Sequence, residues 1–558
     1  MDNKNFSRRG FIKGTGAMAL SAGLASPFTS CRVPSQGEAK PAADEGPLLQ
    51  IGEDIALANT EYGRVKGFVM RGVITFLGIP YGADTSGANR FMPPRRPEAW
   101  EGVRPAVFCG NSAPQNIYDR SATSYGAFID HWNYDELSEN CLTLNIWTKA
   151  LDSARRPVIV WLHGGGFTSG NAIEQDGYHG ENLARYGDVV FCSVNHRLGA
   201  FGFSDLSAAG DKYKDSGNVG LLDMIAALQW VHNNIAGFGG DPGNVTIIGQ
   251  SGGGAKVSVL AACPQARGLV HKGVALSGSS VSGISKDDAR RLGEYILREA
   301  KLSPSKADKL QEMPWREYLD IANAAARKLR EEQGEAPPGV RRGFAPVADG
   351  ILLPEGTFFE QPLPDSPDIP MLFCTTFHEQ SPSRTEAALE GITLPEVVER
   401  LRQRFGDKAQ AVVDAYANNF PGSKPVEILA FILSNRQSVV RTANAKLHQS
   451  SGIWMAWFGW CPPLFDGRMR AFHCLDISFW FMNTDLMLTH SGGGARPRAL
   501  STRMADALVA FARTGDPNSG SLPAWPAYSA ANGETMILND DSLVANDPDR
   551  SARAVLEG

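Results

Sequence analysis

A serine flanked by glycines has the clearest chemical use of any feature in this chain. Gly249-Gln250-Ser251-Gly252-Gly253 follows the apolar run 245–248 and precedes the helix-compatible stretch 255–261. A strand, a tight turn with serine at its apex and a helix together present a serine hydroxyl as a nucleophile. The turn strains the backbone, so the residues two before and two after the serine must be small, and both are glycine. The helix points N–H groups and its positive dipole end towards the serine, where negative charge develops. The sequence therefore predicts Ser251 as a catalytic nucleophile.

A run of glycines after another apolar stretch is the candidate for binding that negative charge. Residues 158–162 lead directly into His163-Gly164-Gly165-Gly166-Phe167. Consecutive glycines let the backbone turn its N–H groups towards a substrate carbonyl with no side chain in the way. We expect an oxyanion hole built from this run and from the amide of Gly252, the alternative being a flexible glycine turn.

The strand–serine–helix turn is typical of the α/β-hydrolase fold, in which an acid and then a histidine follow the serine along the chain. Glu379 lies in a short loop after the apolar run 369–374, where the acid is expected. His473 lies among apolar residues after a loop, as a buried base requires. Spacing alone leaves both assignments open.

Other histidines also follow Ser251. His378 is adjacent to Glu379, and neighbouring side chains on an extended backbone point apart. His448 lies in a polar helical segment and is expected at the surface, and His490 lies beside a glycine run and is expected in a loop. None of these three fits the role of the base as well as His473.

The elements that must position these residues alternate from about residue 55 onwards between short β-branched runs and helical segments. This pattern predicts an α/β protein with a central, mostly parallel twisted sheet flanked by helices, the α/β-hydrolase fold. The clearest predicted strands are 142–147, 158–162, 189–194, 245–248 and 274–276. The stretch 221–235 has apolar residues at helical spacing and is predicted to be a core helix. Two charged helical stretches, 286–333 and 385–450, are predicted as excursions that cover the active site.

The N-terminus carries targeting signals instead of a part of the fold. Ser7-Arg8-Arg9-Gly10-Phe11-Ile12-Lys13 matches a twin-arginine export motif and precedes a weakly apolar stretch. Phe28-Thr29-Ser30-Cys31 resembles a bacterial lipoprotein processing site, with Phe28 where leucine is usual. We predict an export signal over 1–31, a linker over 32–50 and one domain over 51–558. The expected location is the periplasm of a bacterium, or the cell envelope if Cys31 carries a lipid.

Composition excludes some classes of function. The 558 residues are 43% hydrophobic and 20% charged, as in ordinary globular enzymes, and the net charge of −6 gives no basic surface for nucleic acid. After the signal, no run of 18 apolar residues predicts a membrane span. Among eight cysteines, Cys109 with Cys141 is the pair nominated for a disulfide, and the others are expected to be buried thiols. We expect a monomer that requires no metal or organic cofactor.

From about residue 55 to its end, the chain resembles the type-B carboxylesterases, the family of bacterial para-nitrobenzyl esterases and animal cholinesterases. The matching motifs are 76–81, 90–91, 139–147, 194–202, 217–223, 511–518 and 525–526. The resemblance assigns the nucleophile to Ser251, the acid to Glu379 and the base to His473. It assigns the oxyanion amides to Gly165, Gly166 and Gly252. It implies hydrolysis of small-molecule carboxylic esters through an acyl-enzyme, and it implies no cofactor.

The resemblance also implies two structural ion pairs, Arg90 with Glu139 and Arg197 with Asp223. The chain departs from the family at Gln250, where glutamate is usual, and this loss of negative charge disfavours a cationic substrate. Cys109 is displaced from the family's cysteine position, which leaves the disulfide in doubt.

Trp132 lies near the position of the choline-binding tryptophan of cholinesterases, one residue out of register. It is either a pocket wall that stacks on an apolar group or a tryptophan packed under a loop.

Two other functions remain as alternatives. One is a hydrolase with the same mechanism acting on an amide, carbamate, thioester or lactone. The other is a non-catalytic binding protein on the same fold, which is disfavoured because every catalytic position is filled.

Overall fold

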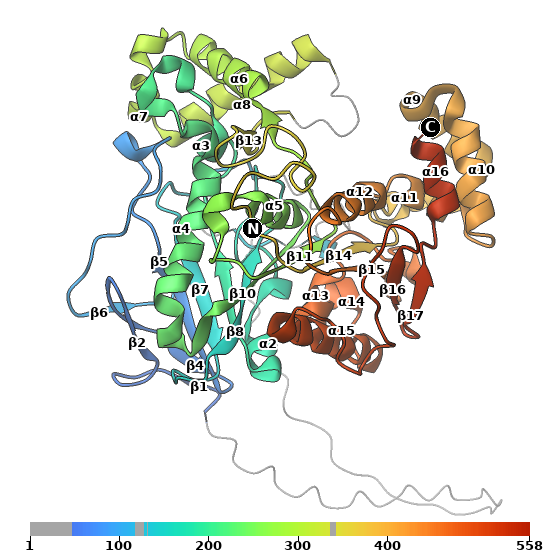
Figure 1. Ribbon diagram of the computed structural model, residues 1–558, viewed down its shortest axis with the longest axis horizontal. Helices are drawn as coiled ribbons and strands as arrows, with labels where there is room; N and C mark the ends of the chain where they lie inside the picture. The colour runs from blue at the N-terminus through green and yellow to red at the C-terminus, as the bar shows by residue number, and fades with distance from the viewer. Residues whose placement is uncertain (1–46, 118–127, 131, 135, 335–341, 558) are drawn as a thin grey trace, which may run out of the picture. The chain divides into compact units, whose positions relative to one another are not determined.

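The computed structural model describes residues 47–117, 128–130, 132–134, 136–334 and 342–557. The predicted export signal, including Cys31, and most of the predicted linker lie outside these residues. Within them the chain forms a 12-stranded sheet with the order β1-β4-β5-β7-β9-β8-β10-β11-β14-β15-β16-β17 (Figure 1). Its strands are β1 (Leu49–Gln50), β4 (Phe68–Met70), β5 (Val73–Pro80), β7 (Thr143–Thr148), β8 (Arg156–Leu162), β9 (Val190–Val194), β10 (Gly240–Gln250), β11 (Lys272–Leu276), β14 (Met371–Thr376), β15 (Ile453–Phe458), β16 (Glu534–Leu538) and β17 (Leu543–Asn546).

The middle of this sheet is parallel from β9 through β16, and antiparallel strands form both edges. This arrangement confirms the predicted α/β-hydrolase fold. Parallel strands bring their carboxyl ends to one edge, which is where ligands bind in sheets of this kind. A smaller sheet pairs β2 (Leu57–Thr60), β3 (Gly63–Lys66) and β6 (Val103–Pro105), and β12 (Ile284–Ser285) pairs with β13 (Val347–Ala348).

Alternating side chains of the central strands divide the core between two faces of the sheet. In β8, Val158, Val160 and Leu162 belong to one buried cluster, whereas Ile159 and Trp161 belong to the other. The first face is covered by α4 (Val219–Asn234) and α5 (Gly252–Ala262), and the second by α2 (Glu181–Gly187), α13 (Ile477–Trp480) and α15 (Ala495–Thr514).

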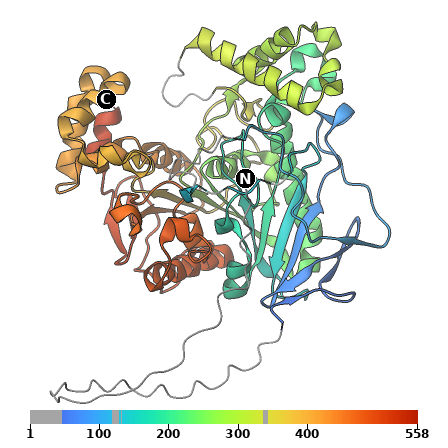
Figure 2. The ribbon, with the colours of Figure 1, turned by 180° about the vertical axis from the view of Figure 1, so that it is seen from behind.

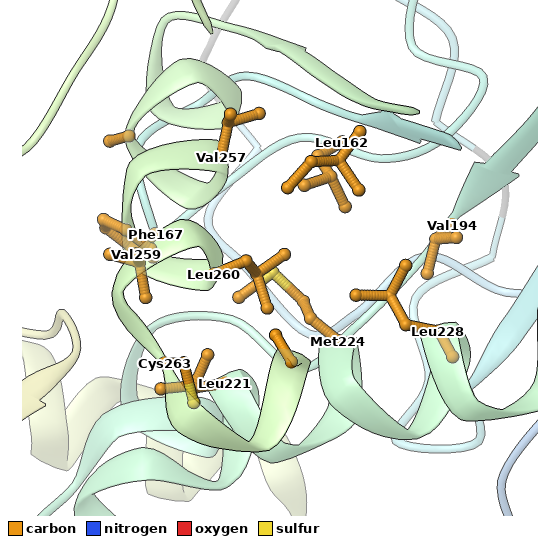
Figure 3. Close-up of a cluster of buried hydrophobic side chains, with 14 of the residues drawn as sticks. Leu162, Phe167, Val194, Leu221, Met224, Leu228, Val257, Val259, Leu260 and Cys263 are labelled. Atoms are coloured by element: carbon orange, nitrogen blue, oxygen red, sulfur yellow. The ribbon is translucent and has the colours of Figure 1, made fainter. Parts of the chain in front are cut away.

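Side chains from α4 and α5 interlock over the first face. Figure 3 shows Met224 of α4 against Leu260 of α5, Leu221 near Cys263 and Leu228 near Val194 of the sheet. The apolar spacing predicted for 221–235 is therefore a core contact. This packing fixes α5, the helix that follows Ser251.

The two predicted helical excursions are present. The first contains α6 (Lys286–Glu299), α7 (Lys309–Glu312) and α8 (Trp315–Gln333). The second contains α9 (Leu394–Phe405), α10 (Ala409–Asn419), α11 (Pro425–Ile432) and α12 (Arg436–Lys446). In Figure 1 and, from behind, in Figure 2, α9, α10 and the C-terminal α16 (Arg550–Glu557) form a group beside the sheet. A third buried cluster, which includes Val397, Val413, Ile428 and Ala552, holds this group together.

Both ion pairs implied by the resemblance are confirmed. Arg90 meets Glu139 through two hydrogen bonds of 2.6 Å, and Arg197 meets Asp223 through bonds of 2.7 and 2.8 Å. All four side chains are buried. Each pair has two parallel bonds and two buried partners. Removing one partner would leave the other as an unpaired buried charge, which is strongly destabilising.

The disulfide nominated from the sequence is not formed. Cys141 is a buried free thiol, so it is not bonded to Cys109. Burial raises the pKa of the Cys141 thiol well above its ordinary value. Among the described residues, no helix has the length and apolar character needed to cross a membrane.

Candidate active site

Ser251 is the single residue that connects the end of β10 to the start of α5. Its backbone has φ 58° and ψ −120°, on the side of the conformational map that side-chain-bearing residues rarely occupy. The Ser251 N–H donates to the carbonyl of Leu276 at the end of β11 (2.7 Å), and its carbonyl accepts the N–H of Ala255 (3.2 Å). Strand, strained serine and helix thus follow one another as the motif predicts.

The glycines around this turn are required by packing. A Cβ atom on Gly253 would overlap the carbonyl oxygen of Leu162, and one on Gly249 would overlap the backbone of Gly253. A Cβ on Gly278, in the neighbouring loop after β11, would overlap the carbonyl oxygen of Ser251. The backbone therefore crosses itself so closely at the serine that side chains have no room.

The three predicted oxyanion residues come together at this crossing. Gly165 and Gly166 have φ of 79° and 64°, and a Cβ on Gly252 would overlap the backbone nitrogen of Gly166. In the described part of the chain, the N–H groups of Gly165 and Gly166 have no hydrogen-bond partner. Gly252 is the first residue of α5, so its N–H takes no part in the helical bonding pattern. This arrangement can bind a carbonyl oxygen that gains negative charge.

His473 and Glu379, which are far apart in the sequence, form a short hydrogen bond. The His473 Nδ1 lies 2.5 Å from Glu379 Oε2. In addition, the backbone N–H of His473 donates to the backbone carbonyl of Glu379 (3.2 Å). The other carboxylate oxygen of Glu379 accepts the N–H of Thr376 at the end of β14 (2.8 Å). The carboxylate is therefore fixed on both sides, and the Nδ1 proton is directed towards it.

The environment of His473 favours its protonated form. Burial lowers the pKa of His473, but interactions with Cys474 and Glu379 outweigh it, and the pKa is raised well above its ordinary value. The imidazole is 30% exposed while the Glu379 side chain is 1% exposed. The histidine can thus meet substrate while the acid stays shielded.

The Gln250 side chain lies against His473. Its Nε2 is 3.3 Å from Nδ1 and 3.2 Å from Nε2 of the imidazole. An atom nearly equidistant from both ring nitrogens cannot lie in the ring plane without overlapping the ring carbons, so this amide lies over the ring face. Its Oε1 accepts the thiol hydrogen of Cys474 (3.3 Å). Gln250 is fully buried, and its neutral amide occupies a position where a carboxylate would face the base.

In the described residues, no hydrogen bond joins the Ser251 hydroxyl to the His473 ring. Ser251 directly follows Gln250 in the chain, so the ring and the serine are brought to the same turn. Such bonds are often long in enzymes without substrate and tighten in the complex.

A cavity of about 450 Å³ opens beside His473. It is lined by Asp130, Trp132, Glu379, Gln380, Ser381, Pro382, Arg384, Thr385, Leu433, Phe472, His473 and Cys474. Trp132, for which the sequence left open a pocket wall or a position packed under a loop, is in this lining, and Leu433 comes from the second excursion. Lys286 and Arg290 of the first excursion line a separate cavity of about 640 Å³.

An ion pair crosses the wall of the 450 Å³ cavity. Arg384 bonds to Asp130, and its guanidinium lies 4.7 Å from the centre of the Phe472 ring. Burial raises the pKa of Asp130, against the opposing effect of Arg384. Sequence reasoning missed this pair because neither residue belongs to a recognisable motif. The only available signal was the position of Asp130 close to Trp132.

The remaining histidines have other surroundings. The His378 Nδ1 accepts the N–H of Ala471 (3.4 Å), and His448 is exposed, as predicted. The predicted loop position of His490 is wrong. This residue is buried in α14 (Leu488–Ser491), where its Nε2–H donates to the carbonyl of Ile129 (3.0 Å) and its ring packs on Phe472.

Comparisons with known proteins agree with this fold. The model of the carboxylesterase family matches residues 54–554. The para-nitrobenzyl esterase of Bacillus subtilis (strain 168) is 34% identical over 510 residues, which cover 90% of this chain and 98% of that protein. The phenmedipham hydrolase of Pseudarthrobacter oxydans is 31% identical over 503 residues, with coverage of 88% and 97%. A solved esterase from the anaerobe Clostridium hathewayi, described as able to hydrolyze aliphatic aromatic polyesters, superposes with a TM-score of 0.78 at 34% identity, covering 91% and 99%.

Proposed function

This chain belongs to the carboxylesterase family and is a carboxylic ester hydrolase, and from this premise we propose that Ser251, His473 and Glu379 are its catalytic triad. The observation that carries the proposal is the 2.5 Å bond between His473 and Glu379 beside a strained serine at a strand–helix turn. A nucleophile, a base and an orienting acid are the groups that acyl transfer requires.

The proposed reaction has two halves. The Ser251 hydroxyl attacks the ester carbonyl carbon while His473 takes its proton, and the carbonyl electron pair moves onto oxygen. The intermediate collapses, the alcohol leaves with the proton from His473, and the acyl group stays on Ser251. Water then repeats the sequence on the acyl-enzyme and releases the acid. Glu379 stabilises the imidazolium in both halves and keeps the ring in the correct tautomer.

The amides of Gly165, Gly166 and Gly252 are proposed to bind the oxyanion of each tetrahedral intermediate. Removing one such donor typically costs about 3–4 kcal/mol of transition-state stabilisation. The positive φ of Gly165 and Gly166 supports this role, because it lets two successive N–H groups face the same point.

The test compares wild type with Ser251→Ala on esters of increasing acyl length. We expect turnover to fall by at least about 10⁴-fold, with labelling by a fluorophosphonate probe abolished. His473→Ala should be similarly impaired, whereas His448→Ala, at an exposed histidine, should behave as wild type. Equal turnover by wild type and Ser251→Ala would refute the nucleophile assignment.

We further propose that the enzyme is exported through the twin-arginine route and acts as a monomer in the periplasm, or at the cell envelope if a lipid is attached to Cys31. The support is the motif 7–13 and the sequence 28–31. Buried thiols such as Cys141, Cys192 and Cys374 are compatible with folding in a reducing compartment before export.

A further inference from the structure

A lysine is buried in the core directly behind the proposed oxyanion hole. Lys256 lies on α5, the helix that begins after Ser251, and its side chain has no exposed surface. Its neighbours along the helix, Ala255 and Val257, are buried apolar residues. Moving an ammonium group out of water is costly, so a lysine at this position requires a compensating interaction.

The Lys256 Nζ donates a hydrogen bond of 2.9 Å to the carbonyl oxygen of His163. His163 is the first residue after β8 and directly precedes Gly164, Gly165 and Gly166. In the described part of the chain, Lys256 is the hydrogen-bond donor to this carbonyl. The bond therefore links α5, the helix that follows Ser251, to His163, the first residue of the loop 163–170, here called the oxyanion loop.

Two buried histidines adjoin this bond. The rings of His163 and His196 stack with centroids 5.1 Å apart. The Nδ1 of His163 bonds to the carbonyl of Gly164 (2.9 Å), and that of His196 bonds to the carbonyl of Arg197 (2.8 Å). Burial, with a further contribution from Lys256, lowers the pKa of both histidines well below its ordinary value. Both rings are thus neutral and donate from Nδ1.

Glu174 is a carboxyl group that interacts electrostatically with Lys256. It is buried, and its oxygens accept hydrogen bonds from Tyr178 (3.3 Å) and Tyr134 (3.4 Å). Burial raises the pKa of Glu174 to about 7 and lowers the pKa of Lys256 to about 7, and each group partly offsets this effect in the other.

The cluster contacts the oxyanion loop at its far end as well. A Cβ on Gly170 would lie 2.6 Å from His163 Nδ1 and 3.2 Å from Glu174 Oε2. The backbone of Gly170 is held by the Gln115 amide through bonds of 2.7 and 3.0 Å. The loop is therefore held at both ends by buried polar groups. Lys256 holds the end that directly precedes Gly165 and Gly166, the proposed oxyanion donors.

We propose that Lys256 is a positioning residue for ester hydrolysis, which fixes the His163 carbonyl and thereby aims the N–H groups of Gly165 and Gly166 at the oxyanion. The proposal rests on the proposed function, because it assumes that these amides bind the oxyanion. Since the oxyanion exists only in the transition state and the intermediates, loss of Lys256 should lower kcat and leave KM nearly unchanged.

The test is Lys256→Met, which keeps an unbranched side chain of similar volume and removes the donor. We expect kcat to fall about 10- to 100-fold with KM unchanged, which is less than the roughly 100- to 1000-fold loss caused by removing an oxyanion donor outright, because the amides themselves remain. A trifluoromethyl ketone inhibitor provides the second readout. The Ser251 oxygen adds to its carbonyl carbon, His473 takes the serine proton and the resulting oxyanion occupies the hole. Its affinity should weaken by the same factor as kcat/KM.

Ser258→Ala is the matched control. Ser258 is on the same helix and equally buried, and its hydroxyl bonds within the helix, to the carbonyl of Gly254 (3.3 Å). Its kcat and inhibitor affinity should match wild type. Lys256→Gln, a shorter residue that retains an amide donor, should recover part of the lost kcat and provides a second variant if Lys256→Met does not fold.

Unchanged kcat in both Lys256 variants would overturn the proposal. So would an equal loss in Ser258→Ala, or a fall in kcat without a fall in inhibitor affinity. Ser251→Ala assayed in parallel separates the two hypotheses. An active Ser251→Ala protein would refute the proposed function itself, whereas an inactive one beside an unaffected Lys256→Met would refute only the role of Lys256.

Discussion

The imidazole of His473 contacts one charged and one neutral side chain. Glu379 meets it in the ring plane with a carboxylate, and Gln250 covers its face with a neutral amide. The carboxylate stabilises the protonated ring, while the amide adds no charge. The pKa of His473 therefore depends on its neighbours, and neither Glu379 nor Gln250 exchanges a proton with the substrate in the proposed reaction.

Glu379→Gln should reduce kcat about 10⁴-fold, because the amide no longer stabilises the imidazolium or selects its tautomer. The base works only when neutral, so activity of the wild type falls as pH drops through the raised pKa of His473, which lies above 6.5. Without the carboxylate that pKa falls, and the acid limb of kcat/KM should move to lower pH. A pH–rate profile on a neutral ester measures both effects. Glu386→Gln, at an exposed glutamate, is the control, and an unmoved acid limb would contradict the assignment.

Gln250→Glu should have the opposite effect on the profile. A second carboxylate against the ring raises the pKa of His473 further, so the acid limb should move to higher pH. The added charge should also improve kcat/KM for a cationic ester relative to a neutral ester of the same size. Gln250→Met, which adds no charge, controls for the lost amide. A profile that stays in place would show that residue 250 is not in contact with the base in solution.

At the scale of elements, the site depends on how closely β8, β10 and α5 approach one another. Gly249, Gly252 and Gly253 allow the strand and the helix to cross without side chains, and this places the serine beside the oxyanion loop. The requirement for small residues on either side of Ser251 therefore comes from the close packing of β8, β10 and α5.

Gly253→Ala tests this crossing. The added methyl group would overlap the Leu162 carbonyl, so the backbone must shift, and we expect a loss of about 1–3 kcal/mol in the free energy of unfolding. Activity should fall further than stability, because the shift occurs at the oxyanion loop. Denaturant unfolding and kcat measurements check the two parts. Gly391→Ala is the control, since a Cβ there meets nothing within 4 Å. Full activity in Gly253→Ala would show that the crossing tolerates a side chain.

The sequence predicted those elements that have a distinctive periodicity. The central strands and the helix at 221–235 were found because β-branched runs and helical apolar spacing are separable patterns. β15, which precedes His473, was not singled out. Its residues Ile-Trp-Met-Ala-Trp-Phe are apolar on both faces, and such a run has no alternation to distinguish a strand from a buried helix.

The reacting residues were easier to predict than their surroundings. Ser251 and the glycine run lie in local motifs, whereas Glu379 and His473 needed the family resemblance to be separated from other candidates. The contact of Gln250 with His473 and the Asp130–Arg384 pair depend on tertiary packing between residues 223 and 254 positions apart. No local pattern encodes such contacts.

At the scale of the whole molecule, the catalytic domain is preceded by residues 7–13, whose sequence matches the twin-arginine motif and for which we propose an export role. Replacing both Arg8 and Arg9 by lysine should leave the active enzyme in the cytoplasmic fraction, because the route depends on the arginine pair. Esterase assays on periplasmic and cytoplasmic fractions measure the distribution. Lys4→Arg, outside the motif, is the control, and unchanged export of the double variant would rule out this route.

The order in which the site is supplied along the chain has a consequence for translation. The glycine loop and Ser251 emerge from the ribosome first, and the residue beside that serine is separated from His473 by 223 positions. A nascent polypeptide would therefore carry the proposed nucleophile without its proposed base until most of the sheet has been synthesised. Products that end before His473 are therefore expected to be inactive, and two separately expressed halves divided between β14 and β15 would form a pair in which hydrolysis reports their association.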